Sequence, residues 1–148
     1  MKLIPLKQWI CDSCGGIIEK PEDGWLEWYS KESVESNFRI VHHNRSCMYD
    51  DLRKHNILVS DLNLTDVIGT HGLANSLFRI ELSEKGVDKI QDLKEFVEIL
   101  RRLHVPYWEE ARLYWDRALK EGFHDGCDFG ENTLRSIIEE FEQSQQDH

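Results

Sequence analysis

Long apolar runs are missing from this chain of 148 residues. No stretch approaches the roughly 18 consecutive apolar residues of a membrane-spanning helix. Residues 1–9 contain neither a long apolar stretch nor a small-residue cleavage site, so we expect no signal peptide. Internal repeats, low-complexity linkers, Gly-rich phosphate loops and Ser-centred nucleophile elbows are missing too. The sequence therefore predicts a cytoplasmic protein without a membrane segment, folded as a single domain over residues 1–148.

Basic residues are scarce. The chain has 18 Lys and Arg against 28 Asp and Glu, which gives a formal net charge of −10. Residues 1–56 contain 8 basic and 9 acidic residues, whereas residues 57–148 contain 10 and 19, so most of the negative charge lies in the second part. Acidic surfaces repel the phosphate backbone of nucleic acids. We therefore expect a protein partner, and we do not expect nucleic acid to bind.

Cysteine occurs only four times, but two of the four form a motif. Cys11 and Cys14 are separated by two residues and are followed by Gly15 and Gly16. Two thiolates at this spacing can bind one metal ion from a tight turn, in which glycine allows positive φ and close approach of the backbone. A reducing compartment keeps such thiols free, which favours a metal over a disulfide. The motif predicts a Zn²⁺ site.

A second group of candidate ligands follows about thirty residues later. His43 and Cys47 are four residues apart, a spacing that places both on one side of a helical turn. His42 and Cys47 are five apart, which suits a junction between a loop and a helix. We favour His43, because His42 shares the apolar face of a predicted strand with Phe38 and Ile40. The expected ligand set is therefore Cys11, Cys14, His43 and Cys47, with His42 as the alternative to His43.

One further Cys/His pair lies in the polar loop 123–131. His124 and Cys127 can supply alternative zinc ligands, or they can pair a thiolate with an imidazole as nucleophile and base. The simpler interpretation, which we favour, is a loop between two helices with an incidental cysteine.

The ligand pattern over residues 7–55 resembles the zinc knuckles of treble-clef and zinc-ribbon-like proteins. A knuckle at Cys11 and Cys14 is followed by 28 residues before His43, which is enough for a β-hairpin. The resemblance implies a hairpin between the two ligand pairs and a helix that starts near Cys47. It also implies a structural zinc ion.

The overall pattern predicts an α+β fold. A small zinc-bound β-hairpin lobe is expected over residues 1–56, with strands near 25–29 and 38–42 and a short helix over 47–54. A helical lobe of about four helices is expected over residues 57–148, including a short helix over 61–68 and a strongly amphipathic one over 88–104. Pro106 suits the first turn of a further helix, on which we expect Glu109 and Glu110 to lie on a solvated face.

The expected function is that of a protein-interaction or regulatory module with a structural zinc ion, and we do not expect an enzyme. A Cys-rich set of four ligands leaves no open position on the metal. One alternative is a metal-dependent hydrolase or nuclease with an open zinc site, in which His42 or His124 acts as the base. The other alternative is a nucleic-acid-binding adaptor that works through the less acidic residues 1–56.

Overall fold

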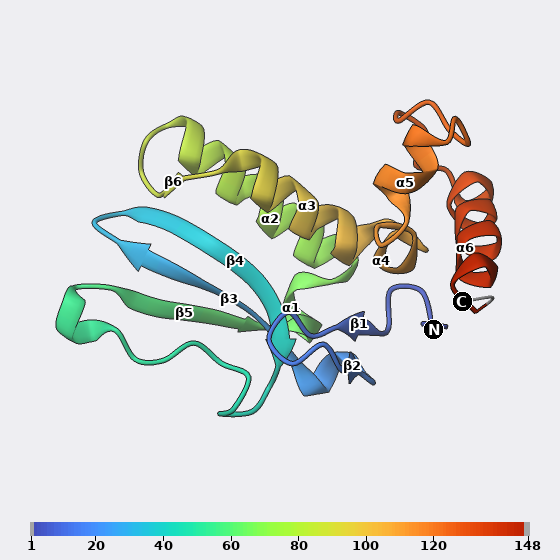
Figure 1. Ribbon diagram of the computed structural model, residues 1–148. Helices are drawn as coiled ribbons and strands as arrows, with labels where there is room; N and C mark the ends of the chain where they lie inside the picture. Colours follow the sequence, from blue (N-terminus) through green and yellow to red (C-terminus); the bar gives the residue numbers. More distant parts are fainter. Residues whose placement is uncertain (1, 147–148) are drawn as a thin grey trace.

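The computed structural model describes residues 2–146. Its centre is a four-stranded sheet with the spatial order β5-β3-β4-β6 (Figure 1). The strands are β3 (Gly24–Lys31), β4 (Val34–His42), β5 (Leu58–Asn63) and β6 (Lys89–Ile90). β3 pairs antiparallel with β4 and β5, while the short β6 pairs parallel with β4. Two of the four strands therefore lie beyond residue 56, in the part for which the sequence predicts only helices.

The β3–β4 hairpin confirms the hairpin predicted after the cysteine motif. Its two turn residues, Glu32 and Ser33, have φ values of 51° and 63°. Positive φ at both central positions matches the right-handed twist of a two-residue hairpin. The register pairs Gly24 with His42, so β4 ends beside the start of β3.

A second, two-stranded sheet lies beside the first. It consists of β1 (Trp9–Ile10) and β2 (Ile17–Ile18), which pair antiparallel with Trp9 opposite Ile18. Both of these side chains are fully buried. Residues 11–16 connect the two strands as a tight turn, and the 3₁₀ helix Pro21–Asp23 leads from β2 into β3. The apolar side chains of this small sheet hold the cysteine turn against the rest of the protein.

Six α-helices lie within residues 2–146, more than the four or so that the sequence predicts. They are α1 (Leu64–Val67), α2 (Gly69–Glu84), α3 (Leu93–His104), α4 (Trp108–Ala111), α5 (Trp115–Lys120) and α6 (Glu131–Gln146). Helices α2 and α3 lie next to each other beside the four-stranded sheet, and α6 lies at the opposite end of the molecule from the β3–β4 turn (Figure 1). No helix among the described residues is both long enough and apolar enough to cross a membrane.

Helix α3 confirms most of the amphipathic helix predicted over residues 88–104. Its inner face buries Phe96, Ile99 and Leu103, at the spacing of one helical stripe. The side chain of Asp92 caps its N-terminus by accepting a hydrogen bond from the backbone N–H of Glu95 at 3.3 Å. The first residues of the predicted helix instead form β6, because Lys89 and Ile90 pair with β4.

Two apolar cores divide the molecule differently from the predicted lobes. The first core joins side chains of β1–β4 with side chains of α1 and α3. The second core joins α4, α5 and α6, and includes Trp108, Tyr114 and Phe141. The cores therefore separate after α3, and not at residue 56. The sheet recruits α3 because the apolar face of β4 needs a helix to cover it.

The segment after Cys47 corrects two predictions. Residues 47–54 do not form the expected helix, and only the 3₁₀ turn Arg53–His55 is present. Contacts with the sheet hold this segment in an irregular loop: the Tyr49 backbone N–H donates to the Glu27 carboxylate at 3.0 Å, and the Tyr49 ring packs 4.2 Å from the Tyr29 ring. The short helix predicted over 61–68 is confirmed only over Leu64–Val67, because the preceding residues pair with β3 as β5.

Candidate metal centre

Three cysteines and one histidine converge beside the end of β4. The cluster consists of Cys11 and Cys14 from the turn between β1 and β2, His42 from the last position of β4, and Cys47 from the loop that follows. One ligand atom from each of the four residues lies within 4.8 Å of all the others. Cys11 and Cys47 are buried, and Cys14 is exposed. This Cys₃His group can hold a metal ion.

The turn between β1 and β2 has the hydrogen bonds that a metal-binding thiolate pair needs. The backbone N–H of Ser13 donates to Cys11 Sγ, and that of Gly16 donates to Cys14 Sγ, each at 3.4 Å. Gly15 has a φ of 77°. A Cβ atom on Gly16 would lie 3.4 Å from Cys14 Sγ and 3.6 Å from the His42 ring. The two glycines of the motif therefore turn the chain and leave room for the sulfurs.

The electrostatics of the buried sulfurs favour a nearby cation. Burial acts to raise the pKa of the Cys11 thiol, but N–H groups of Cys14, His42 and Ser13 donate to the sulfur and lower that pKa to about 6. The pKa of Cys47 is raised, first by burial and then by the Cys14 and Cys11 thiols beside it. Adjacent like charges resist ionising together. A bound cation would offset the repulsion between the neighbouring thiolates.

The imidazole of His42 is oriented for coordination through one nitrogen. Its Nε2 lies 3.1 Å from the carbonyl oxygen of Ile17 and donates a hydrogen bond to it. In the neutral ring this leaves Nδ1 as the acceptor nitrogen, and it lies 3.4 Å from Cys14 Sγ and 3.8 Å from Cys47 Sγ. A carbonyl that fixes the second ring nitrogen is the usual support of a metal-bound histidine.

The spacing of these atoms fits a tetrahedral ion. Bond lengths of about 2.3 Å to sulfur and 2.0–2.1 Å to nitrogen, at tetrahedral angles, place a sulfur and a nitrogen about 3.6 Å apart. The two distances from Nδ1, 3.4 and 3.8 Å, bracket that value. The donor set and these two distances are therefore compatible with one tetrahedral metal ion.

The structure brings His42, and not the favoured His43, into the cluster. The His43 ring packs against the Trp25 ring with the centroids 3.9 Å apart and the planes tilted by 32°, and the His43 backbone N–H donates to the Asp23 carbonyl at 2.7 Å. His42 does follow Phe38 and Ile40 on one face of β4, as the alternation predicts. The cysteine turn lies against this end of β4, where the His42 backbone N–H donates to Cys11 Sγ at 3.4 Å, and it brings the sulfurs to His42.

His124 and Cys127 do not join the cluster. The His124 and Trp115 ring centroids lie 3.9 Å apart, with the planes tilted by 33°. The His124 Nε2 donates to the Trp115 carbonyl at 3.0 Å, and its Nδ1 accepts from the Gly126 N–H at 3.0 Å. Cys127 is exposed, and the neighbouring Asp125 carboxylate raises the pKa of its thiol. Both imidazole nitrogens of His124 are therefore hydrogen-bonded within the loop and the adjoining helix, and the raised pKa disfavours a Cys127 thiolate.

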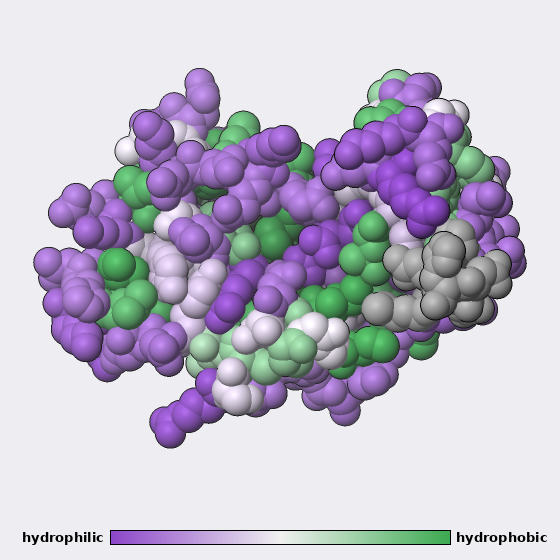
Figure 2. All heavy atoms as spheres, viewed as in Figure 1, coloured by the Kyte–Doolittle hydropathy of each residue, from purple (hydrophilic) through white to green (hydrophobic). Residues whose placement is uncertain are grey.

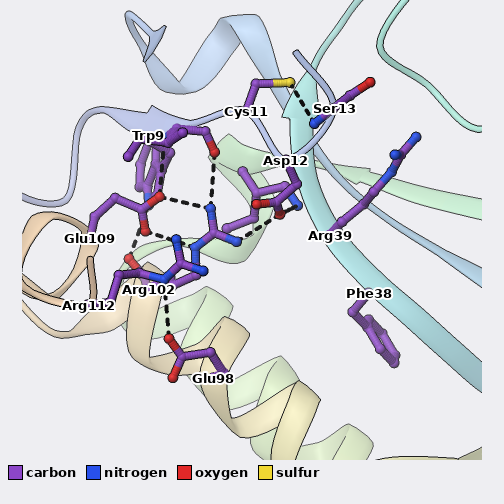
Figure 3. A network of polar contacts seen from close by, with 12 residues as sticks. Trp9, Cys11, Asp12, Ser13, Phe38, Arg39, Glu98, Arg102, Glu109 and Arg112 are labelled. Atoms are coloured by element: carbon purple, nitrogen blue, oxygen red, sulfur yellow. Dashed lines mark hydrogen bonds and ion pairs between the residues drawn. The ribbon is translucent and has the colours of Figure 1, made fainter. Parts of the chain in front are cut away.

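A buried ionic network attaches the cysteine turn to α3 and α4 (Figure 3). Arg102 of α3 is only 3% exposed, and its guanidinium binds both carboxylate oxygens of Glu109 at 2.8 Å. The same guanidinium donates to Asp12 Oδ2 at 2.7 Å and to the Ile10 carbonyl at 3.1 Å. Asp12 lies between Cys11 and Cys14, so the network reaches into the cysteine turn itself.

Backbone groups complete the same network. The indole N–H of Trp9 donates to the Arg102 carbonyl, and the N–H of Ile10 donates to Glu109, each at 3.1 Å. The N–H of Ile40 in β4 donates to Asp12 Oδ2 at 2.8 Å. Glu109 is therefore buried, and its predicted place on a solvated face is wrong. Glu110 is also buried, and it accepts a hydrogen bond from the backbone N–H of Leu3.

Comparison of the chain with protein-family models, with curated proteins and with solved structures finds no match.

Proposed function

We propose that this protein is a non-enzymatic protein-interaction module stabilised by one structural Zn²⁺ ion, with Cys11, Cys14, His42 and Cys47 as ligands. The observation that carries the proposal is the closed set of four donors, whose spacing suits a tetrahedron. Structural zinc sites are almost always four-coordinate and rich in cysteine. Three soft sulfur donors select Zn²⁺ over the hard cations Mg²⁺ and Ca²⁺, which prefer oxygen.

A hydrolytic role of the metal is less well supported. A catalytic zinc ion keeps one position for water, whereas four protein donors fill the tetrahedron. The two histidines considered as a base are both committed: His42 to the cluster and the Ile17 carbonyl, and His124 to Trp115 and Gly126. A general base needs a nitrogen that is free to take a proton from water.

Helix α2 supports a protein partner. It turns Gly72 and Ser76 inward, and it leaves Leu73 and Leu77 on the surface with exposed fractions of 36% and 49%. Leucines four residues apart lie on one side of a helix and can serve together as apolar anchors. Most of the surface seen in Figure 2 is hydrophilic, with apolar side chains in small patches. With a net charge of −10, the chain suits a partner with a basic surface.

The reduced state of the cysteines supports a cytoplasmic location. All four cysteines are free of disulfides, and the three in the cluster must be thiolates to hold a metal. The reducing cytoplasm keeps them in that state.

The metal assignment is tested by measuring zinc content and the X-ray absorption spectrum. We expect one Zn²⁺ per chain with three sulfur donors and one nitrogen donor in the wild type. Cys47→Ser should lose most of the metal, while the matched control Cys127→Ser should keep it. Equal zinc in both variants would disprove the ligand set, and a water oxygen in place of a protein donor would favour the hydrolase.

The partner surface is tested with a purified partner, identified by cross-linking and mass spectrometry. Its affinity is then measured for the wild type, for Leu77→Asp, and for the control Leu119→Asp on α5. We expect Leu77→Asp to weaken binding at least about tenfold, as for a central apolar anchor. Equal affinity of all three proteins would place the interface elsewhere. Retention of the protein on heparin at moderate salt would instead favour the nucleic-acid adaptor.

A further inference from the structure

The rest of the chain covers one edge of the four-stranded sheet and leaves the other open. Along the β4 edge, β6 pairs with residues 34–35. Beyond β6, the Phe38 N–H donates to the Glu95 carboxylate at 2.7 Å, and the Ile40 N–H donates to the Asp12 carboxylate at 2.8 Å. The Ile40 carbonyl in turn accepts from the Asp12 N–H at 2.8 Å. The β4 edge is therefore occupied over most of its length.

The opposite edge is formed by β5, the last strand in the spatial order (Figure 1). Its residues pair with β3 in a regular register, without a bulge. In an antiparallel pair, alternate residues direct their N–H and C=O groups away from the neighbouring strand. Among the described residues, no hydrogen bond joins the backbone of residues 58–62 to any segment except β3. The outward groups of β5 therefore form an unpaired row of donors and acceptors.

The sequence of β5 lacks the usual features that protect an open edge. The strand reads Leu-Val-Ser-Asp-Leu-Asn, with no lysine or proline and with Asp61 as its one charge. Leu58, at its first position, is 56% exposed. Natural proteins normally protect such an edge, because it can pair with another strand. An open β5 edge, opposite an edge that specific hydrogen bonds close, therefore indicates a place for a further strand.

The strand β5 is suited to pairing with a second copy of itself. Two antiparallel copies related by a two-fold axis at Ser60 place Leu58 of each copy opposite Leu62 of the other, and Val59 opposite Asp61. A cross-strand pair of leucines buries apolar surface. The two Asp61 carboxylates do not face each other directly in this register, so like charges are not paired across the contact.

The cavity between α2 and the sheet supports the same contact. It has a volume of about 590 Å³ and reaches the β5 edge, because Ser60 and Leu62 line it together with Phe78 of α2. Phe78 is 53% exposed. Residues 58, 60 and 62 share one face of the strand, and a two-fold axis perpendicular to the sheet preserves that face. Leu58 of a second copy would therefore lie on the cavity side of the sheet and cover apolar side chains that a single chain leaves open to solvent.

We propose that this protein forms a two-fold symmetric dimer through β5, which joins the two four-stranded sheets into one continuous sheet. Each copy contributes Leu58 to the edge of the other copy's cavity, and the unpaired backbone groups of the two β5 strands bind each other. An isologous contact of this kind closes after two copies. The dimer goes beyond the proposed interaction function, because it uses neither the metal cluster nor Leu73 and Leu77.

Sedimentation equilibrium of the full-length protein in a reducing buffer measures the association. The reducing buffer prevents dimers that are linked by a disulfide between exposed cysteines. We expect a species of twice the chain mass of 17.5 kDa at micromolar concentrations. A protein that stays monomeric up to about 100 μM would overturn the proposal, because such an affinity is that of a transient contact only.

The variants Leu58→Lys and Leu119→Lys compare the β5 edge with a control surface on α5. Both leucines are exposed, with fractions of 56% and 41%. We expect Leu58→Lys to raise the dissociation constant of the dimer at least about tenfold, because it places an ammonium group opposite Leu62 of the second copy. Leu119→Lys should dimerise like the wild type. Thermal melts verify that both variants are folded, and equal dissociation constants would overturn the proposal.

The register is tested on the wild-type protein, without any substitution. A sample is mixed from chains with ¹³C-labelled leucine and unlabelled chains, and an isotope-filtered NMR experiment detects contacts between copies. Residues 58 and 62 of one strand are about 13 Å apart, too far for a nuclear Overhauser effect, so a signal between their methyl groups arises only between copies. We expect this signal. Its absence from an associated protein would place the interface elsewhere and overturn the proposal.

Discussion

Two segments of this chain carry a histidine and a cysteine a few residues apart, and their surroundings differ completely. In residues 42–47, the imidazole of His42 has one nitrogen fixed by the Ile17 carbonyl and the other directed at sulfur. In residues 124–127, the imidazole of His124 uses both nitrogens within its own loop and the adjoining helix. What distinguishes the two is a third chain segment. The cysteine turn reaches the end of β4 and brings two further thiols, whereas no second cysteine within residues 2–146 joins His124 in a metal-binding group.

The largest loss of folding stability should come from removing one thiol of the cluster that contains His42. We expect Cys11→Ser to destabilise the protein by more than about 5 kcal/mol, because binding of structural zinc contributes directly to folding. A loss of that size lowers the melting temperature by about 10 °C or more in a chain of this length. Thermal denaturation followed by circular dichroism measures the change.

The matched variant in the second segment is Cys127→Ser. Its thiol is exposed, so we expect the stability to change by less than about 0.5 kcal/mol. If chelation of the metal lowers the melting temperature of neither the wild type nor Cys127→Ser, the structural role of the metal is refuted.

The next effect concerns the network that holds the cysteine turn. Arg102→Met leaves the buried carboxylate of Glu109 without its partner, and we expect a loss of about 3–5 kcal/mol. We also expect weaker metal binding, by about tenfold, because Asp12 in the turn loses its support. Urea denaturation and a competitive zinc titration measure the two quantities.

Arg112→Met serves as the control for this network. Arg112 forms a partly exposed pair with Glu98 at 3.3 Å, so its loss should cost less than about 1 kcal/mol. The double variant Arg102→Met/Glu109→Leu should recover much of the stability, since it removes both buried charges. If Arg102→Met and Arg112→Met lower the free energy of unfolding equally, burial of the network contributes nothing to stability.

A third, smaller effect is the difference in zinc affinity between substitutions of the adjacent residues His42 and His43. His42→Ala should weaken zinc binding by at least about 100-fold. Residues that only support a ligand typically change metal affinity by about 10–100-fold, and the loss of a ligand itself should exceed that. His43→Ala should change it less than threefold, about 0.7 kcal/mol, because that ring contacts Trp25 and not the sulfurs. Competition with a chromophoric chelator measures both affinities, and the opposite order would restore His43 as the ligand.

The smallest expected effect is that of His124→Ala. The substitution removes two hydrogen bonds and the ring contact with Trp115, so we expect a loss of about 1–2 kcal/mol with unchanged zinc content. Denaturation and metal analysis on the same sample separate the two quantities. Loss of zinc in this variant would contradict the contrast between the two segments.

Local features of this molecule could be predicted from its sequence. The Cys-x-x-Cys-Gly motif predicts the turn and its two thiols, since spacing and glycine act within a few residues. The apolar stripe of α3 predicts a helix, and the alternation around Phe38 and Ile40 predicts a strand of the hairpin. The assignment of an α+β fold follows from these elements.

Features that depend on distant contacts could not be predicted in this way. The choice of His42 depends on which part of the chain covers the end of β4. The burial of Glu109 depends on Arg102, and the contact of Arg102 with Asp12 spans 90 residues of sequence. The segment after Cys47 forms an irregular loop because Glu27 binds the Tyr49 N–H, which overrides local helical preference.

The position of Arg102 in the chain also affects how the protein matures during synthesis. All four residues of the metal cluster have been synthesised once Cys47 is made, and Arg102 follows 55 residues later. At about 5–20 residues per second, that interval lasts roughly 3–11 s. Under the proposed zinc assignment, the nascent chain can thus bind its ion while α3 is still being translated, and the guanidinium then docks onto a turn that is already formed. Conversely, a chain that emerges when zinc is scarce exposes three reactive thiols to oxidation before α3 is complete.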